Sequence, residues 1–184
     1  MKSLAQETTE QLPFRSIEAY PDNYGPGSVM ARMIDGLGYR YYWATEGLRT
    51  EDLDYRPSED ARSTGETIDH LYGLSQMIAL NPQKKPNVRP RVEEELSFEE
   101  KRAATLANLE TARKLYASST EADLEAYAIL FQRGDQTSEI SFWHMINGPI
   151  ADAIYHVGQV VSFRRSSGNP MNPKVNVFMG KNRD

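Results

Sequence analysis

The chain has 184 residues, enough for one well-buried domain and too few for two comfortable ones. Its 39% hydrophobic and 26% charged residues are ordinary for a soluble globular protein, and its net charge of −5 disfavours binding to nucleic acid or to an anionic membrane. Cysteine is absent, which excludes disulfides and thiolate metal ligands and means that any reactive thiol comes from outside the chain.

The sequence also indicates where the protein is located. The first residues contain no apolar core of signal-peptide length, and the sequence has no apolar run able to span a bilayer. We therefore expect a cytoplasmic protein without a membrane partner, and the missing cysteine agrees with this.

Residues 1–27 mix polar residues with three prolines, which predicts an extended N-terminal arm. The first long helix is expected from Ser28, a good N-cap residue, to about Gly47, because apolar residues recur there at helical spacing. A second helix is predicted over 63–80, opened by a capping box between Ser63 and Glu66.

The connection over 81–96 contains three prolines and is too long and stiff for a tight hairpin, so we expect a crossover between parallel helices. A third helix follows from a capping box at Ser97 to about Ser118. Residues 121–124 suggest a short helical turn, and 127–131 look extended or irregular.

The last helix is expected over 140–166, with a kink at Gly148-Pro149. Residues 171–184 carry enough apolar side chains to pack on the bundle as a C-terminal tail. No strand pair is convincing. The elements predict an all-α fold, a four-helix bundle over 28–170 with a long crossover between its second and third helices.

Two of the three histidines lie on predicted helices beside an apolar face. Asp152 and His156 are one turn apart, so their side chains leave the same face of the last helix about 6 Å apart. With His70 from the second helix they predict a metal site of two histidines and one carboxylate, with open positions for water or substrate. The alternatives are a histidine satisfied within the core and a plain Asp152–His156 ion pair.

Other polar residues have two interpretations each. His144 approaches the same face only if the last helix is straight, and a kink moves it away. Glu66, one turn before His70, is a candidate base or orienting partner of the imidazole, and equally a capping residue. Gln159 either orients His156 or bonds a neighbouring helix. Arg164 complements a helix dipole or binds a substrate carboxylate.

A family resemblance adds to these patterns. The segment INGPIADAIYHVGQV at 146–160, with Gly168-Asn169-Pro170 after it, resembles the last helix of the DinB-like and YfiT-like superfamily of four-helix bundles, which are regarded as metalloenzymes. The histidine of 68–71 matches the second helix of that superfamily, and the resemblance covers about 28–170. His156-Val157-Gly158-Gln159 is its most specific part.

The resemblance implies a divalent metal, zinc or nickel first and iron or manganese as alternatives, held by three histidines. Two of these positions fall on His70 and His156, and the third falls on Asp152, a departure from the three-histidine pattern. Characterised relatives include thiol-dependent transferases and isomerases. They imply a homodimer that acts on a small electrophilic substrate with a low-molecular-weight thiol, by thiol transfer or hydrolysis.

Two other classes of protein fit the same residues. One is a noncatalytic, stress-related protein in which the histidines and the aspartate form a buried polar cluster. The other binds a small molecule without turning it over.

Overall fold

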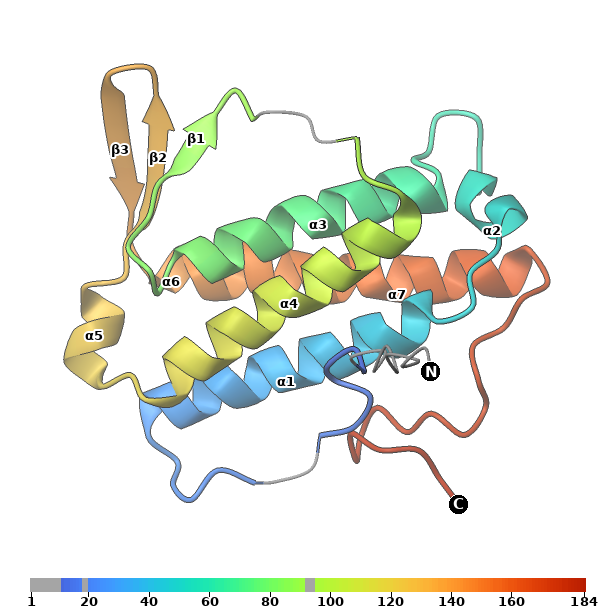
Figure 1. Cartoon of the computed structure of the whole chain (residues 1–184), viewed down its shortest axis with the longest axis horizontal. Helices are drawn as coiled ribbons and strands as arrows, with labels where there is room; N and C mark the ends of the chain where they lie inside the picture. The colour runs from blue at the N-terminus through green and yellow to red at the C-terminus, as the bar shows by residue number, and fades with distance from the viewer. Residues whose placement is uncertain (1–10, 18–19, 92–94) are drawn as a thin grey trace, which may run out of the picture.

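The computed structural model describes residues 11–17, 20–91 and 95–184. Within these ranges four long helical stretches form the predicted bundle (Figure 1). They are α1 (Pro26–Thr45), α3 (Thr64–Leu80), α4 (Phe98–Ala117) and a last stretch made of α6 (Trp143–Met145), η1 (Ile146–Ile150) and α7 (Ala151–Ser166). Parts of the expected arm and crossover, residues 1–10, 18–19 and 92–94, lie outside the described residues.

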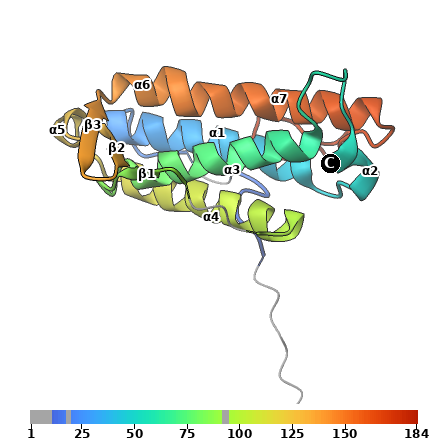
Figure 2. The same cartoon turned by 90° about the horizontal axis from the view of Figure 1, so that it is seen from above.

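The four helices are arranged so that each packs against two others. α1 and α3 both contact α4 and α7, an arrangement that Figure 2 shows from above. α3 and α4 run in one direction, and α1 and α7 run in the opposite direction (Figure 1). The connection after α3 therefore joins two parallel neighbours, which confirms the crossover predicted from its prolines.

The helix starts follow from local capping, with one difference from prediction. Ser63 and Ser97 each accept a backbone N–H bond from the glutamate three residues later, which confirms both capping boxes. The expected N-cap at Ser28 is wrong, because α1 begins at Pro26, whose fixed φ suits the first helical position. The Ser28 hydroxyl donates instead to the side chain of Asn23.

The prediction of no strand pair is also wrong, because a small sheet flanks the bundle. β1 (Asn87–Arg89) pairs in parallel with β2 (Ile129–Arg133), and β2 pairs antiparallel with β3 (Gln136–Ile140). The strands are short, and every residue of β3 is exposed, so they carry little apolar alternation. The sequence pattern that indicates the β2–β3 hairpin is the pair Gly134-Asp135, which forms a two-residue turn in which Gly134 adopts φ +58°.

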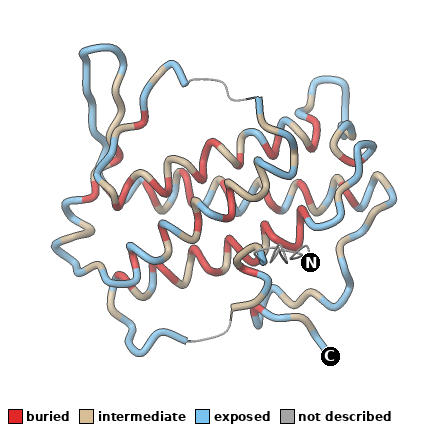
Figure 3. The backbone as a smooth tube through the Cα atoms, in the orientation of Figure 1, coloured by how far each residue is buried: buried red, intermediate tan, exposed pale blue. Residues whose placement is uncertain are grey.

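Helix α1 is buried on more than one side because the described part of the N-terminal arm and the C-terminal tail pack on it. Buried residues line the inward faces of all four helices (Figure 3). At Gly38 a Cβ atom would overlap the ring of Phe14 from the arm, so only glycine permits this approach. The tail joins the arm through a bond from the Ile17 amide to the Gly180 carbonyl, 2.7 Å long. Tyr39 donates its hydroxyl proton to Asn182.

A buried carboxylate accepts hydrogen bonds from residues at the C-terminal end of the last helix and stabilises that end. Asp52, in the short helix α2 (Thr50–Asp54), is fully buried and forms an ion pair with Arg49 at 2.9 Å. It also accepts bonds of 2.6 Å from the Ser167 hydroxyl and from the Asn169 amide. A charge is stable in such a place only when its hydrogen-bonding capacity is satisfied, as it is here.

Arg164 has a related structural role. Its guanidinium is buried, and Nη1 donates to the carbonyl oxygens of Trp43, Ala44 and Glu46 at 2.9–3.1 Å. These carbonyls lie at the C-terminal end of α1, where no later backbone N–H of the helix is available to bond them, and Arg164 supplies the missing donors. Its contacts therefore support a stabilising role for Arg164 at a helix end.

Among the described residues, no helix combines the length and apolar character needed to cross a bilayer.

We predict that Asp52→Ala destabilises the fold by about 3 kcal/mol at pH 7, because it leaves several buried donors without an acceptor. Arg49 holds the pKa of the Asp52 carboxyl well below its ordinary value of about 4. The contribution of the charged form is therefore complete above that value and is lost as the pH falls toward the folded-state pKa. Urea unfolding of both proteins between pH 7 and pH 2 measures the difference.

The matched control is Asp54→Ala, which removes an exposed carboxylate from the same short helix. It is expected to change the unfolding midpoint little. A gap between wild type and Asp52→Ala that does not narrow in acid would contradict the assignment.

Candidate metal centre

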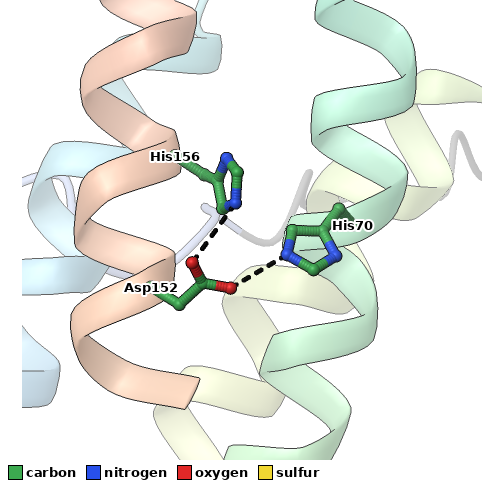
Figure 4. Close-up of side chains that lie close together, drawn as sticks. All are labelled: His70, Asp152 and His156. Atoms are coloured by element: carbon green, nitrogen blue, oxygen red, sulfur yellow. Dashed lines mark hydrogen bonds and ion pairs between the residues drawn. The ribbon is translucent and has the colours of Figure 1, made fainter. Parts of the chain in front are cut away.

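Three side chains from two helices meet at one point. His70 comes from α3, and Asp152 and His156 come from α7, with the rings and the carboxylate pointing toward one another (Figure 4). Asp152 lies between the imidazoles, with Oδ2 3.0 Å from Nε2 of His70 and Oδ1 3.3 Å from Nε2 of His156. One ligand atom from each residue lies within 4.8 Å of the others. Sequence reasoning had named this same trio.

His156 is oriented by Gln159, one turn later on α7. Nδ1 of His156 lies 2.7 Å from Oε1 of Gln159. Because an amide oxygen only accepts hydrogen bonds, Nδ1 carries a proton, and the lone pair of the neutral ring is on Nε2. This is the arrangement in which an outer hydrogen bond prepares a histidine as a metal ligand. The contact supports the orienting interpretation of Gln159.

The same contact favours a positive charge at the cluster. Nε2 of a neutral His156 would turn a lone pair toward the Asp152 carboxylate, and two electron-rich atoms at that distance repel. A proton on Nε2 or a metal ion among the three groups removes the repulsion. The donor set of two imidazoles and one carboxylate suits zinc, nickel, iron and manganese.

The cluster is accessible from one side. The His156 side chain is 12% exposed, whereas His70 and Asp152 are 32% and 40% exposed. His156 therefore forms the inner wall, and the other two groups border the solvent. Three protein ligands on one side would leave positions for water or substrate on the other. The ring of Tyr155, a neighbour that the sequence patterns did not indicate, contacts the His156 ring edge-on at 5.3 Å.

The kink predicted at Gly148-Pro149 is confirmed, and it separates His144 from the cluster. Gly148 departs from helical geometry, with φ −93° and ψ −105°, directly before a proline that cannot continue the hydrogen-bond ladder. His144 is exposed and is not part of the trio that could hold a metal ion among the described residues. Asp152 then falls in the first turn of α7, where the helix dipole stabilises a negative charge.

Glu66 makes contacts other than one with His70. Its carboxylate accepts a bond from the Ser63 amide and forms an ion pair with Arg56 at 2.8 Å. The hydrogen bond from Arg56 lowers the pKa of the Glu66 carboxyl, which makes the group a weaker base. These contacts support the capping interpretation, and a base function for Glu66 stays a prediction. The sequence patterns did not indicate Arg56 as its partner.

Comparison with known proteins identifies the fold and the family. A crystal structure of a DinB-like protein from Bacillus subtilis matches with a TM-score of 0.60 and 14% sequence identity, covering 83% of this chain and 99% of that one. At that identity the likeness shows the fold. No curated protein matches the sequence. The sequence profile of the DinB superfamily matches residues 34–160, a range that includes His70, Asp152 and His156, and the chain belongs to that superfamily.

Proposed function

We propose that His70, Asp152 and His156 bind a divalent metal ion and that the protein is a metal-dependent enzyme. The observation that carries the proposal is the approach of three ligand atoms from two helices to within 4.8 Å of one another. Zinc or nickel is our first choice, and iron or manganese also suits the donor set. The proposed reaction is thiol transfer to, or hydrolysis of, a small electrophilic substrate.

Each side chain of the proposed site has its own role. When bound, the metal lowers the pKa of a coordinated water or thiol, which supplies a nucleophile near neutral pH. His156 and His70 offer Nε2, Asp152 offers a carboxylate oxygen, and Gln159 keeps the proton of His156 on Nδ1. The thiol is external, because the chain has no cysteine. Cytoplasmic location and a homodimer stay predictions.

A noncatalytic protein is the second candidate, and one observation favours it. Nε2 of His70 and Nε2 of His156 already lie at ion-pair distance from Asp152, at 3.0 and 3.3 Å, so protonation of one imidazole would neutralise the carboxylate without a metal. In that case the cluster stabilises the contact between α3 and α7 and needs no metal. Metal analysis separates the two candidates.

We predict one divalent ion per chain in protein purified without an affinity tag and loaded with zinc or nickel. His70→Ala and His156→Ala should each weaken binding by more than about 100-fold, the upper range for outer-shell changes, because each removes a ligand. His144→Ala is the matched control, since it removes an exposed histidine beside the same helix. Elemental analysis and competition with a chromophoric chelator measure occupancy and affinity.

Two outcomes would refute the metal site. One is wild-type protein that takes up no divalent ion. The other is an ion bound as tightly by the double variant His70→Ala, His156→Ala as by wild type.

Gln159 provides a second test of the site. Gln159→Leu removes the acceptor that keeps the His156 proton on Nδ1, so we expect metal affinity to fall by about 10- to 100-fold with the three ligands intact. Gln159→Glu retains an acceptor and should restore affinity. The same chelator competition is the measurement, and equal affinity in all three proteins would count against the orienting role.

Activity is tested with 1-chloro-2,4-dinitrobenzene and a panel of low-molecular-weight thiols, following the absorbance of the conjugate as sulfur displaces chloride. We expect a metal-dependent rate with at least one thiol, lost in His156→Ala and kept in His144→Ala.

Glu66→Gln separates the two roles of Glu66, because glutamine still completes a capping box. A base role predicts a loss of about 100-fold or more, and a capping role predicts none.

A further inference from the structure

A cavity at one end of the bundle lies away from the histidine cluster. It has a volume of about 600 Å³ and is bordered by the first turns of α1, by the short helix α5 (Glu121–Glu125) and by α6 with the start of η1. These elements meet at one end of the bundle (Figure 1). The volume is in the range of small-molecule sites. None of the three cluster residues lines this cavity.

The wall of the cavity is largely apolar. Met30 and Met33 of α1 face Phe142 and Ile146, which flank α6. Methionine side chains adapt their shape to a bound group, and their sulfur contacts aromatic rings favourably. Such a wall favours a ligand with an apolar body.

The charges on the rim have a single sign. Glu121 and Glu125 of α5 line the cavity, whereas no lysine, arginine or histidine does so among the residues that the structure describes. The two carboxylates are four residues apart and therefore share one face of α5. Neither forms an ion pair with a residue in the described ranges. A cation between them would relieve their repulsion.

An exposed indole completes the rim. Trp143 lines the cavity and is 75% exposed, which is unusual for so large an apolar side chain. Tryptophan is the aromatic residue that attracts cations most strongly, and aromatic side chains with carboxylates are a common means of binding ammonium groups. Val29 on the same lining is also exposed, at 47%, so apolar surface is exposed at more than one point of this cavity, as it is at many binding sites.

We propose that this cavity binds a small organic cation, an amine or quaternary ammonium with an apolar body. The apolar part lies against Met30, Met33 and Ile146, and the charged head lies beside Trp143, Glu121 and Glu125. An anion of the same size meets two carboxylates and no positive charge on the lining. The inference does not depend on a metal at the histidine cluster.

The test uses three probes that share one chain length: hexyltrimethylammonium, hexanol and hexanoate. We expect saturable binding of the cation at one site per chain, weaker binding of the alcohol and none of the acid, measured by calorimetry in every protein and by tryptophan fluorescence in the proteins that keep Trp143. The Trp143→Leu variant gives the fluorescence that comes from Trp43. The double variant Glu121→Gln, Glu125→Gln should weaken cation binding by about tenfold. Trp143→Leu should weaken it by about fivefold.

Two control variants test whether cation binding depends on the residues of this cavity. Glu139→Gln removes an exposed carboxylate of β3 that does not line the cavity, and it should bind the cation as wild type does. His156→Ala should also bind it normally, which separates this proposal from the metal site. Equal affinity for hexanoate and the cation, or unchanged binding in the double glutamine variant, would overturn the proposal. Circular dichroism confirms that the variants are folded.

Discussion

The antiparallel contact between α3 and α7 is the constraint on which the candidate metal centre depends. His70 is far in sequence from Asp152 and His156, and only this contact brings its Nε2 to 3.0 Å from the carboxylate. The stiff crossover between α3 and α4 leaves α3 beside both α4 and α7. Burial of the faces that these helices share then holds the imidazoles and the carboxylate in place.

The carboxylate between two imidazoles explains why the cluster favours a positive charge. Gln159 accepts the Nδ1 proton of His156, so the nitrogen that faces Asp152 is a lone pair in the neutral ring. A proton or a metal ion satisfies the site electrostatically, and partial exposure of His70 and Asp152 gives either one access from solvent. The choice between them decides whether the cluster is catalytic or structural.

The last helical stretch contributes to two different surfaces, one on each side of its kink. Trp143 and Ile146, before the kink, line the apolar cavity, while Asp152 and His156, after it, belong to the candidate metal centre. The kink at Gly148 redirects the chain between these segments. It also explains why the exposed His144 is a suitable control for the ligand histidines: it lies on the same stretch, on the far side of the kink.

The sequence by itself determined the four helices, two capping boxes, the kink and the one-turn spacing of Asp152 and His156, because periodicity, Ser-x-x-Glu spacing and proline act over a few neighbours. It indicated His70 as a partner of that pair, but only the packing of α3 on α7 brings the three side chains together. It did not reveal the three-stranded sheet, whose short exposed strands have little pattern of their own. Only the tertiary structure decided that Glu66 pairs with Arg56, that Arg164 closes α1 and that an apolar cavity meets two carboxylates. Those contacts join residues distant in the chain, and packing, rather than local spacing, selects such partners.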